Sequence, residues 1–189
     1  MLEERNSILV SGAAYPASGS RSGAACPRAL DIASESFLGR PSSSDVAVEA
    51  IAGFINDEIY GMQDKDKAFL CNLAVLYVFK GKTRVYTAGD AAAIYYEDGE
   101  LKNVWYGGGK PVGSEAVPEL IYSDEFELAG DARFILVAGR DKRAAEETVA
   151  YYRENNGEDP EDTEGFVKER HCSYVNLYLP KREKRGFLR

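Results

Sequence analysis

Few side chains in this sequence could carry nucleophilic or metal chemistry: three cysteines and a single histidine. Cys26, Cys71 and Cys172 lie far apart and form no Cys-x-x-Cys pair. Cys26, His171 and Cys172 have the residue types of a zinc site, and Cys26 with His171 those of a catalytic thiol pair. Because the spacing fits neither, a packed or hydrogen-bonded histidine is the simpler interpretation. Free thiols fit a reducing compartment, so we expect a cytoplasmic protein.

A second candidate is the glycine-rich stretch GGGKPVG at residues 107–113. Glycines beside a lysine can cradle phosphate, but the nucleotide-binding loop requires the pattern Gly-x-x-x-x-Gly-Lys-Ser/Thr leading into a helix. Here the pattern is absent and a strand is expected to follow. The stretch therefore predicts a flexible loop.

Residues 69–106 form the longest apolar stretch, and turn signals divide it into four runs. Glycine in a turn supplies a positive φ without steric cost, which places a turn at residues 80–82. Gly89-Asp90 gives a second break, and Asp98-Gly99 is a hairpin signal. We expect an antiparallel meander of four strands, 69–79, 83–88, 91–96 and 101–106.

The residues before the meander predict a short strand at 7–14, an irregular loop at 15–29 and a brief strand at 30–33. Serines and Asp45 at residues 42–45 can accept hydrogen bonds from free first-turn amides, so a helix is expected to begin there and end near Gly61. Asn56 is expected to face water. The expected buried face has helical spacing and consists of Ala47, Ile51, Phe54, Ile55 and Ile59.

The residues after the meander predict three more strands and two helices. Residues 118–128 alternate as a strand, and the apolar run 133–138 predicts a central strand covered on both faces. Helices are expected at 141–155 and 166–170, and a last strand at 172–179. Two antiparallel sheets packed face to face with helices outside would bury this set. The predicted fold class is α+β, a four-layer α-β-β-α sandwich formed by one domain, residues 1–180.

The pattern of strand, Gly-Asp, short strand, Asp-Gly-Glu-Leu and strand resembles the central sheet of the metal-dependent protein phosphatases of type 2C. Gly89-Asp90 and Asp98-Gly99-Glu100-Leu101 fall at the family's spacing. Residues 126–138, FELAGDARFILVA, are similar to another family segment, and 172–180 resemble its final strand. The resemblance covers most of residues 7–180 and implies the sandwich already predicted.

The resemblance also implies a chemistry, hydrolysis of phosphoserine and phosphothreonine with two Mn²⁺ or Mg²⁺ ions held by carboxylates. Arg21 stands at the position where the family has an arginine that binds phosphate. At the carboxylate positions that follow, it has Ala25 and Cys26. Glu35 retains one carboxylate of the next motif, and Asp90 is the other residual metal position.

The two remaining family motifs have also lost their carboxylates. Gly139 stands where a bridging Asp is expected, beside Arg140, and Asp141 could compensate only through a backbone shift. His171-Cys172 replaces the final Asp-Asn. Four positive charges facing one or two carboxylates would be poorly neutralised, so the sequence predicts no resident metal, with weak Mn or Mg binding as the alternative.

These losses predict a pseudophosphatase, a binding or regulatory module whose partner is a protein or a phosphopeptide held near Arg21 and Arg140. The alternative is an active phosphatase with a rearranged site that uses Glu35, Asp90 or Asp141. Two simpler interpretations also remain. Arg21 can be a solvated or salt-bridged surface residue, and Asp90 can hold its own turn through neighbouring amides.

Composition excludes several function classes. A net charge of −8 argues against nonspecific binding to nucleic acid or to anionic membranes. No apolar run approaches the ~20 residues that span a bilayer. The exception to the acidic balance is the basic tail at residues 181–189, which predicts either a solvated terminus or a docking site for an acidic partner.

Overall fold

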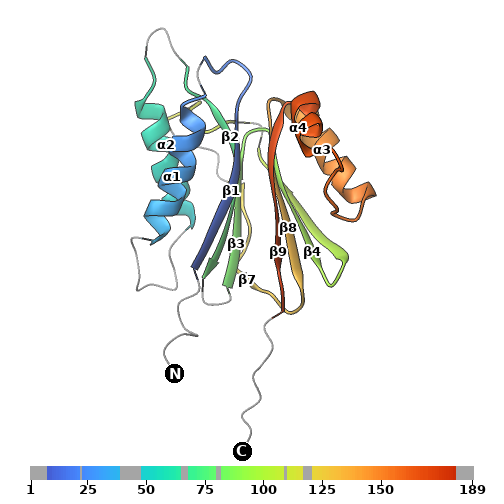
Figure 1. Ribbon diagram of the computed structural model, residues 1–189. Helices are drawn as coiled ribbons and strands as arrows, with labels where there is room; N and C mark the ends of the chain where they lie inside the picture. The colour runs from blue at the N-terminus through green and yellow to red at the C-terminus, as the bar shows by residue number, and fades with distance from the viewer. Residues whose placement is uncertain are drawn as a thin grey trace, which may run out of the picture.

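Two β-sheets lie face to face in the computed structural model, with two helices outside each sheet (Figure 1). The structure describes residues 8–21, 23–38, 48–64, 68–79, 82–108, 110–116 and 121–181. The predicted α-β-β-α sandwich is confirmed. The basic tail from residue 182 onward lies outside the described residues.

The first sheet has the order β1-β2-β3-β6, and β7 also pairs with β3. Its strands are β1 (Ile8–Pro16), β2 (Cys71–Phe79), β3 (Lys82–Ala88), β6 (Ile121–Tyr122) and β7 (Phe126–Glu127), and all pairs are antiparallel. The predicted strand at 118–128 is therefore wrong in part. Two short pieces pair with β3 at different points, and residues 117–120 lie outside the described part.

The second sheet has the order β5-β4-β8-β9. It comprises β4 (Ala91–Glu97), β5 (Glu100–Tyr106), β8 (Ala132–Gly139) and β9 (Cys172–Leu179). Asp98 and Gly99 in the β4–β5 turn have φ of 50° and 80°, the positive values that an Asp-Gly hairpin requires. The predicted continuous burial of 133–138 is confirmed for all but Arg133.

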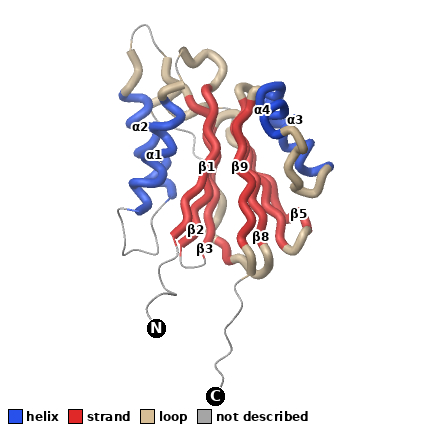
Figure 2. Tube along the Cα trace, viewed as in Figure 1, coloured by secondary structure: helices blue, strands red, loops and turns tan. Residues whose placement is uncertain are grey.

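Helices α1 (Ala25–Leu38) and α2 (Val48–Gly61) cover the outer face of the first sheet, as both views show (Figure 2). The predicted loop 15–29 and strand 30–33 are wrong beyond about residue 22. Ala25, Ala29, Ile32 and Ala33 are buried at helical spacing. Pro27 lies in the first turn, where a missing backbone N–H costs nothing. The abundance of small residues concealed this helix.

Two predictions about α2 are wrong. Phe54 is 48% exposed, while Ile51, Ile55 and Ile59 are buried as predicted. Asn56 is buried rather than solvated, because its Oδ1 accepts from the Gly113 N–H at 3.0 Å and its Nδ2 donates to the Glu115 carbonyl at 3.0 Å. Residues 42–47, including Ala47, lie outside the described part.

Helices α3 (Lys142–Glu154) and α4 (Thr163–Arg170) cover the second sheet. Asp141 caps α3 by accepting from the Ala144 N–H at 3.0 Å. His171 follows α4 in the left-handed region, with φ of 49°. Among the described residues, no helix is long and apolar enough to cross a bilayer.

The core divides into three apolar clusters, which follow from the four layers. One lies between α1, α2 and the first sheet, one between the two sheets, and one between the second sheet and α3 with α4. Because β2 and β8 are covered on both faces, their residues are buried almost without alternation. The strand ends are therefore the parts of these sheets that are available for a site.

Candidate functional site

Asn72 connects the two sheets at the end where the segments predicted to hold the site converge. This side chain from β2 is fully buried. Its Nδ2 donates to the Gly139 carbonyl of β8 at 2.8 Å, and its Oδ1 accepts from the Asp90 N–H at 3.0 Å. A buried amide with both polar atoms bonded fixes the relative position of the elements that it joins.

Backbone hydrogen bonds join the other segments at this end of the two sheets. The Ser18 N–H donates to the Arg140 carbonyl at 3.0 Å, and the Arg140 N–H donates to the His171 carbonyl at 2.8 Å. The Gly139 N–H donates to the Asp90 carbonyl at 2.9 Å. The loop after β1, the β3–β4 turn, the end of β8 and the start of β9 are thus joined directly. We refer to this region as the strand-end junction.

The β3–β4 turn requires glycine at position 89. Its φ is +68°, and a Cβ there would overlap Asn72 Oδ1 and lie 2.9 Å from Pro111 Cα. The turn is therefore held by Asn72 accepting from the Asp90 amide. The interpretation that the Asp90 carboxylate holds this turn is not what the structure shows, because that carboxylate has no hydrogen-bond donor among the described residues.

The Asp90 carboxylate lies in a locally acidic environment. Burial raises the pKa of Asp90, and so does the negative charge of Asp141 and Glu146, while Lys142 opposes them. Asp141 differs because its carboxylate is hydrogen-bonded. The Ala144 N–H lowers the pKa of Asp141, assisted by the Arg140 guanidinium at 3.3 Å. Asp90 and Asp141 are therefore close enough to interact, but only Asp90 has no donor.

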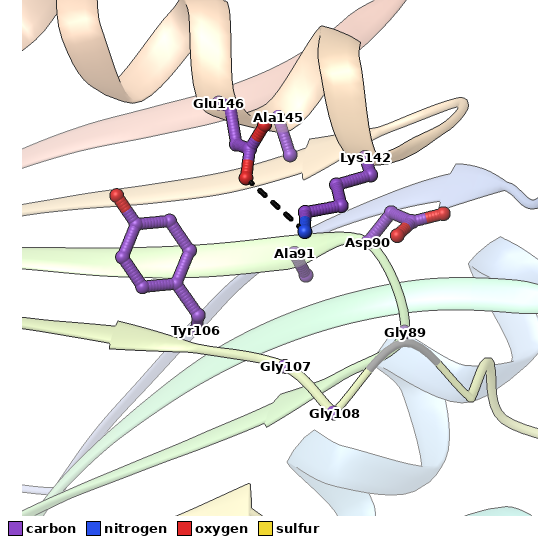
Figure 3. A pocket seen from close by; sticks show the side chains of 9 residues that line it. All are labelled: Gly89, Asp90, Ala91, Tyr106, Gly107, Gly108, Lys142, Ala145 and Glu146. Carbon is purple, nitrogen blue, oxygen red and sulfur yellow. Dashed lines mark ion pairs between the residues drawn. The ribbon is translucent and has the colours of Figure 1, made fainter.

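A hollow of about 410 Å³ adjoins the junction on the outer side of the second sheet (Figure 3). Tyr106, Lys142 and Glu146 extend around it, and the Lys142 Nζ lies 3.6 Å from a Glu146 carboxylate oxygen. The Asp90 carboxylate points away from this ion pair. Small residues complete the lining of the hollow: Gly89, Ala91, Gly107, Gly108 and Ala145.

Arg21, the predicted phosphate-binding residue, lies in the loop that enters the junction. Its backbone N–H donates to the Ala68 carbonyl at 3.0 Å, and Ser20 beside it accepts from the Leu70 N–H at 3.2 Å. The residue is exposed and makes further interactions of its own. Arg140 is also half exposed, and its carbonyl accepts from Ser18 in the same loop.

Glu35, predicted as a residual metal position, lies elsewhere. It is near the end of α1, on the outer side of the first sheet, with 73% of its side chain exposed and an Arg28 nitrogen 4.0 Å away. Asp90 is at the opposite side of that sheet, in the junction. The structure therefore does not bring Glu35 and Asp90 together.

The predicted thiol and histidine candidates are also separated. Cys26 is in the first turn of α1 and belongs to the cluster beneath α1 and α2, whereas His171 caps α4 and Cys172 is the first residue of β9, in the cluster beneath α3 and α4. Within the described ranges, no group of three or more His, Cys, Asp and Glu side chains could hold a metal ion. Because Ala25, Cys26 and Gly139 supply no carboxylate, these residues do not fit a two-metal cluster.

Sequence reasoning missed the residue that organises this end, Asn72. Its signal was a polar side chain inside the apolar run 69–79. A buried strand tolerates such a residue only when its polar atoms are bonded.

Solved structures resemble this chain over nearly its whole length. The phosphatase Stp1 from Staphylococcus aureus matches with a TM-score of 0.66 and 10% identity, covering 93% of this chain and 85% of Stp1. The catalytic domain of the phosphatase PstP with two manganese ions matches with a TM-score of 0.56 and 14% identity, covering 91% of this chain and 87% of that domain. PppA from Pseudomonas aeruginosa matches with a TM-score of 0.54 and 13% identity, covering 94% of this chain and 92% of PppA. No protein-family model matches the chain, and no curated protein matches its sequence.

These likenesses show the fold. The type 2C phosphatase fold implied by the sequence motifs is confirmed, with both sheets and their flanking helices. At this level of identity, activity does not follow from fold alone.

Proposed function

We propose that this chain, which has the type 2C phosphatase fold, is a non-catalytic member that binds a phosphorylated peptide at the strand-end junction. The observation that supports it most is the set of hydrogen bonds made by Asn72 and by the backbones of Ser18, Gly139 and Arg140. They include Gly139, the position at which the family resemblance implies a bridging carboxylate. Hydrogen-bonded backbone carbonyls and a neutral amide cannot neutralise four positive charges.

Phosphate binding rests on two cations of the junction. Arg21 is exposed in the loop that enters it, and Arg140 is half exposed at its centre. A guanidinium donates two parallel hydrogen bonds to a phosphate group, which makes arginine well suited to this role. The overall charge of −8 repels an acidic peptide, so its attraction must come from local cations such as these two.

The test compares a fluorescent phosphoserine peptide with its unphosphorylated form by fluorescence anisotropy. We expect the phosphorylated peptide to bind more tightly, and Arg21→Gln and Arg140→Gln each to weaken it about tenfold. The matched control is Arg143→Gln, which removes an equally positive and more exposed side chain from α3. Equal affinity for both peptides, or equal weakening by all three substitutions, would contradict the proposal.

A second candidate is an active phosphatase with a rearranged, single-ion site. The proximity of Asp90 and Asp141 supports it, since burial and then the charge of Asp141 raise the pKa of Asp90. Asp141 is already bonded to Ala144 and Arg140, which leaves Asp90 as the only uncommitted carboxylate of the pair. Isothermal titration calorimetry with Mn²⁺ tests this candidate. Binding that Asp90→Asn removes would support it, and no heat at millimolar Mn²⁺ would exclude it.

A further inference from the structure

Cys26 and Cys71 lie together although 45 positions separate them in the sequence. Both belong to the apolar cluster between α1, α2 and the first sheet. Cys26 is in the first turn of α1, and Cys71 is the first residue of β2. The two side chains are close enough for each thiol to shift the pKa of the other. Neither thiol is used by the proposed phosphate site.

The two thiols are not equivalent. The Cys71 thiol donates to the Asn72 carbonyl at 3.4 Å. Turned toward Cys26 instead, the same S–H stabilises a thiolate there, which lowers the pKa of Cys26 and, together with burial, raises the pKa of Cys71. Cys26 also lies at a helix N-terminus, where the helix dipole favours a thiolate. Cys26 therefore has the features of the thiol that reacts first with an oxidant, and Cys71 has those of the resolving thiol that then attacks Cys26.

Access also distinguishes the two. Cys26 is 7% exposed, whereas Cys71 is fully buried. An oxidant close to the size of water can reach Cys26 first. Cys71 is then reached only by the neighbouring sulfur.

We infer that Cys26 and Cys71 form a reversible intramolecular disulfide when the protein meets hydrogen peroxide. The Cys26 thiolate attacks one peroxide oxygen, so that an S–O bond forms, the O–O bond breaks and hydroxide leaves as water after taking a proton. The Cys71 thiol then attacks the Cys26 sulfur. The S–S bond forms, the S–O bond breaks, and the departing hydroxide takes the thiol proton to give a second water.

The bond would fasten the start of α1 to the start of β2. The segment between Arg21 and Cys26 and the segment between Ala68 and Cys71 are already joined, since the Arg21 N–H donates to the Ala68 carbonyl. A cross-link a few residues further along would close this connection covalently. The inference does not depend on phosphate binding.

Trypsin makes the test direct, because it releases each cysteine in a separate peptide: residues 22–28, 68–80 and 171–181. The full chain is reduced, freed of reductant, treated with hydrogen peroxide and digested without reductant for mass spectrometry. We expect one product that joins the first two peptides, lighter than their sum by two hydrogen atoms and reversed by dithiothreitol. Peptide 171–181 should remain reduced.

Two substitutions give independent readouts. Cys71→Ser should abolish the cross-link and leave Cys26 as a sulfenic acid that dimedone traps, while Cys26→Ser should leave Cys71 unmodified. Cys172→Ser, the matched control, should leave the cross-link unchanged. The inference is overturned if the native protein stays reduced, if the bond involves Cys172 or a second chain, or if it forms only in urea. Circular dichroism melting confirms that each variant is folded.

Discussion

Asn72 of the first sheet and Gly139 of the second are joined by a hydrogen bond of 2.8 Å between the Asn72 side-chain amide and the Gly139 carbonyl. The same side chain accepts from the Asp90 amide. One neutral, fully buried residue therefore sets the distance between the sheets at the strand-end junction.

Asn72→Ala should destabilise the protein by about 2 to 3 kcal/mol, because it leaves the Asp90 N–H and the Gly139 carbonyl without their partner. Asn72→Asp should be worse, since its carboxylate cannot donate to Gly139 and would be buried. Urea unfolding monitored by circular dichroism measures both. Asn103→Ala, on the exposed strand β5, is the control and should change stability by less than about 0.5 kcal/mol. Similar values for Asn72 and Asn103 would refute the role given to Asn72.

Gly89→Ala and Gly99→Ala separate crowding from backbone strain. Both glycines have positive φ, but a Cβ at Gly99 meets nothing within 4 Å, whereas one at Gly89 meets Asn72 and Pro111. We expect a loss of about 1 kcal/mol for Gly99→Ala from strain alone, and about 3 kcal/mol for Gly89→Ala, where overlap adds to it. Equal losses in thermal denaturation would show that the close approach at Gly89 is unimportant.

The hydrogen bonds of Glu97 should make part of the protein's folding stability depend on pH in the acid range. Its carboxylate accepts from Tyr95 Oη at 2.8 Å and from the amides of Ala129 and Gly130, and these bonds, the one from Tyr95 most of all, lower the pKa of Glu97. A lowered pKa in the folded state contributes stability above the ordinary value of 4.5, and this contribution disappears as the pH falls through the folded-state value.

Glu97→Gln should therefore cost only about 0.5 kcal/mol at pH 7, because water screens this largely exposed carboxylate, and progressively less below pH 4.5. Urea titrations across that range measure the difference from the wild type. Glu127→Gln, on an exposed position of β7, serves as the control. A difference that persists unchanged into strong acid would show that the charge of Glu97 has no part in the effect.

The sheets were predictable because their signals are local. Apolar runs and Gly-containing turns mark β2 to β5 and β8 directly. Helix α1 was not predicted, because its buried residues are mostly alanines, and an alanine-rich composition also fits a loop. Only the spacing of these residues indicates a helix. Phe54 was misplaced for a related reason. Helical spacing gives a face, but only packing decides which edge of that face remains exposed.

The candidate site was predictable only in part. The motifs near Asp90, Gly139 and His171 do meet at one end, as their backbone bonds show. Glu35 was assigned by motif spacing, directly after a strand predicted at 30–33. Because residues 25–38 are helical instead, Glu35 lies on the outer surface. The role of Asn72 depends on partners 18 and 67 positions away, which no local pattern contains.

The measurement that tests the central claim most directly is turnover of a phosphoserine peptide, and of p-nitrophenyl phosphate, with the purified chain in millimolar Mn²⁺. The account predicts no phosphate release above the protein-free background, and no difference among the wild type, Glu35→Ala and Asp90→Asn. Mn²⁺-dependent release that either substitution abolishes would contradict it, because carboxylates of this chain would then be holding a working metal.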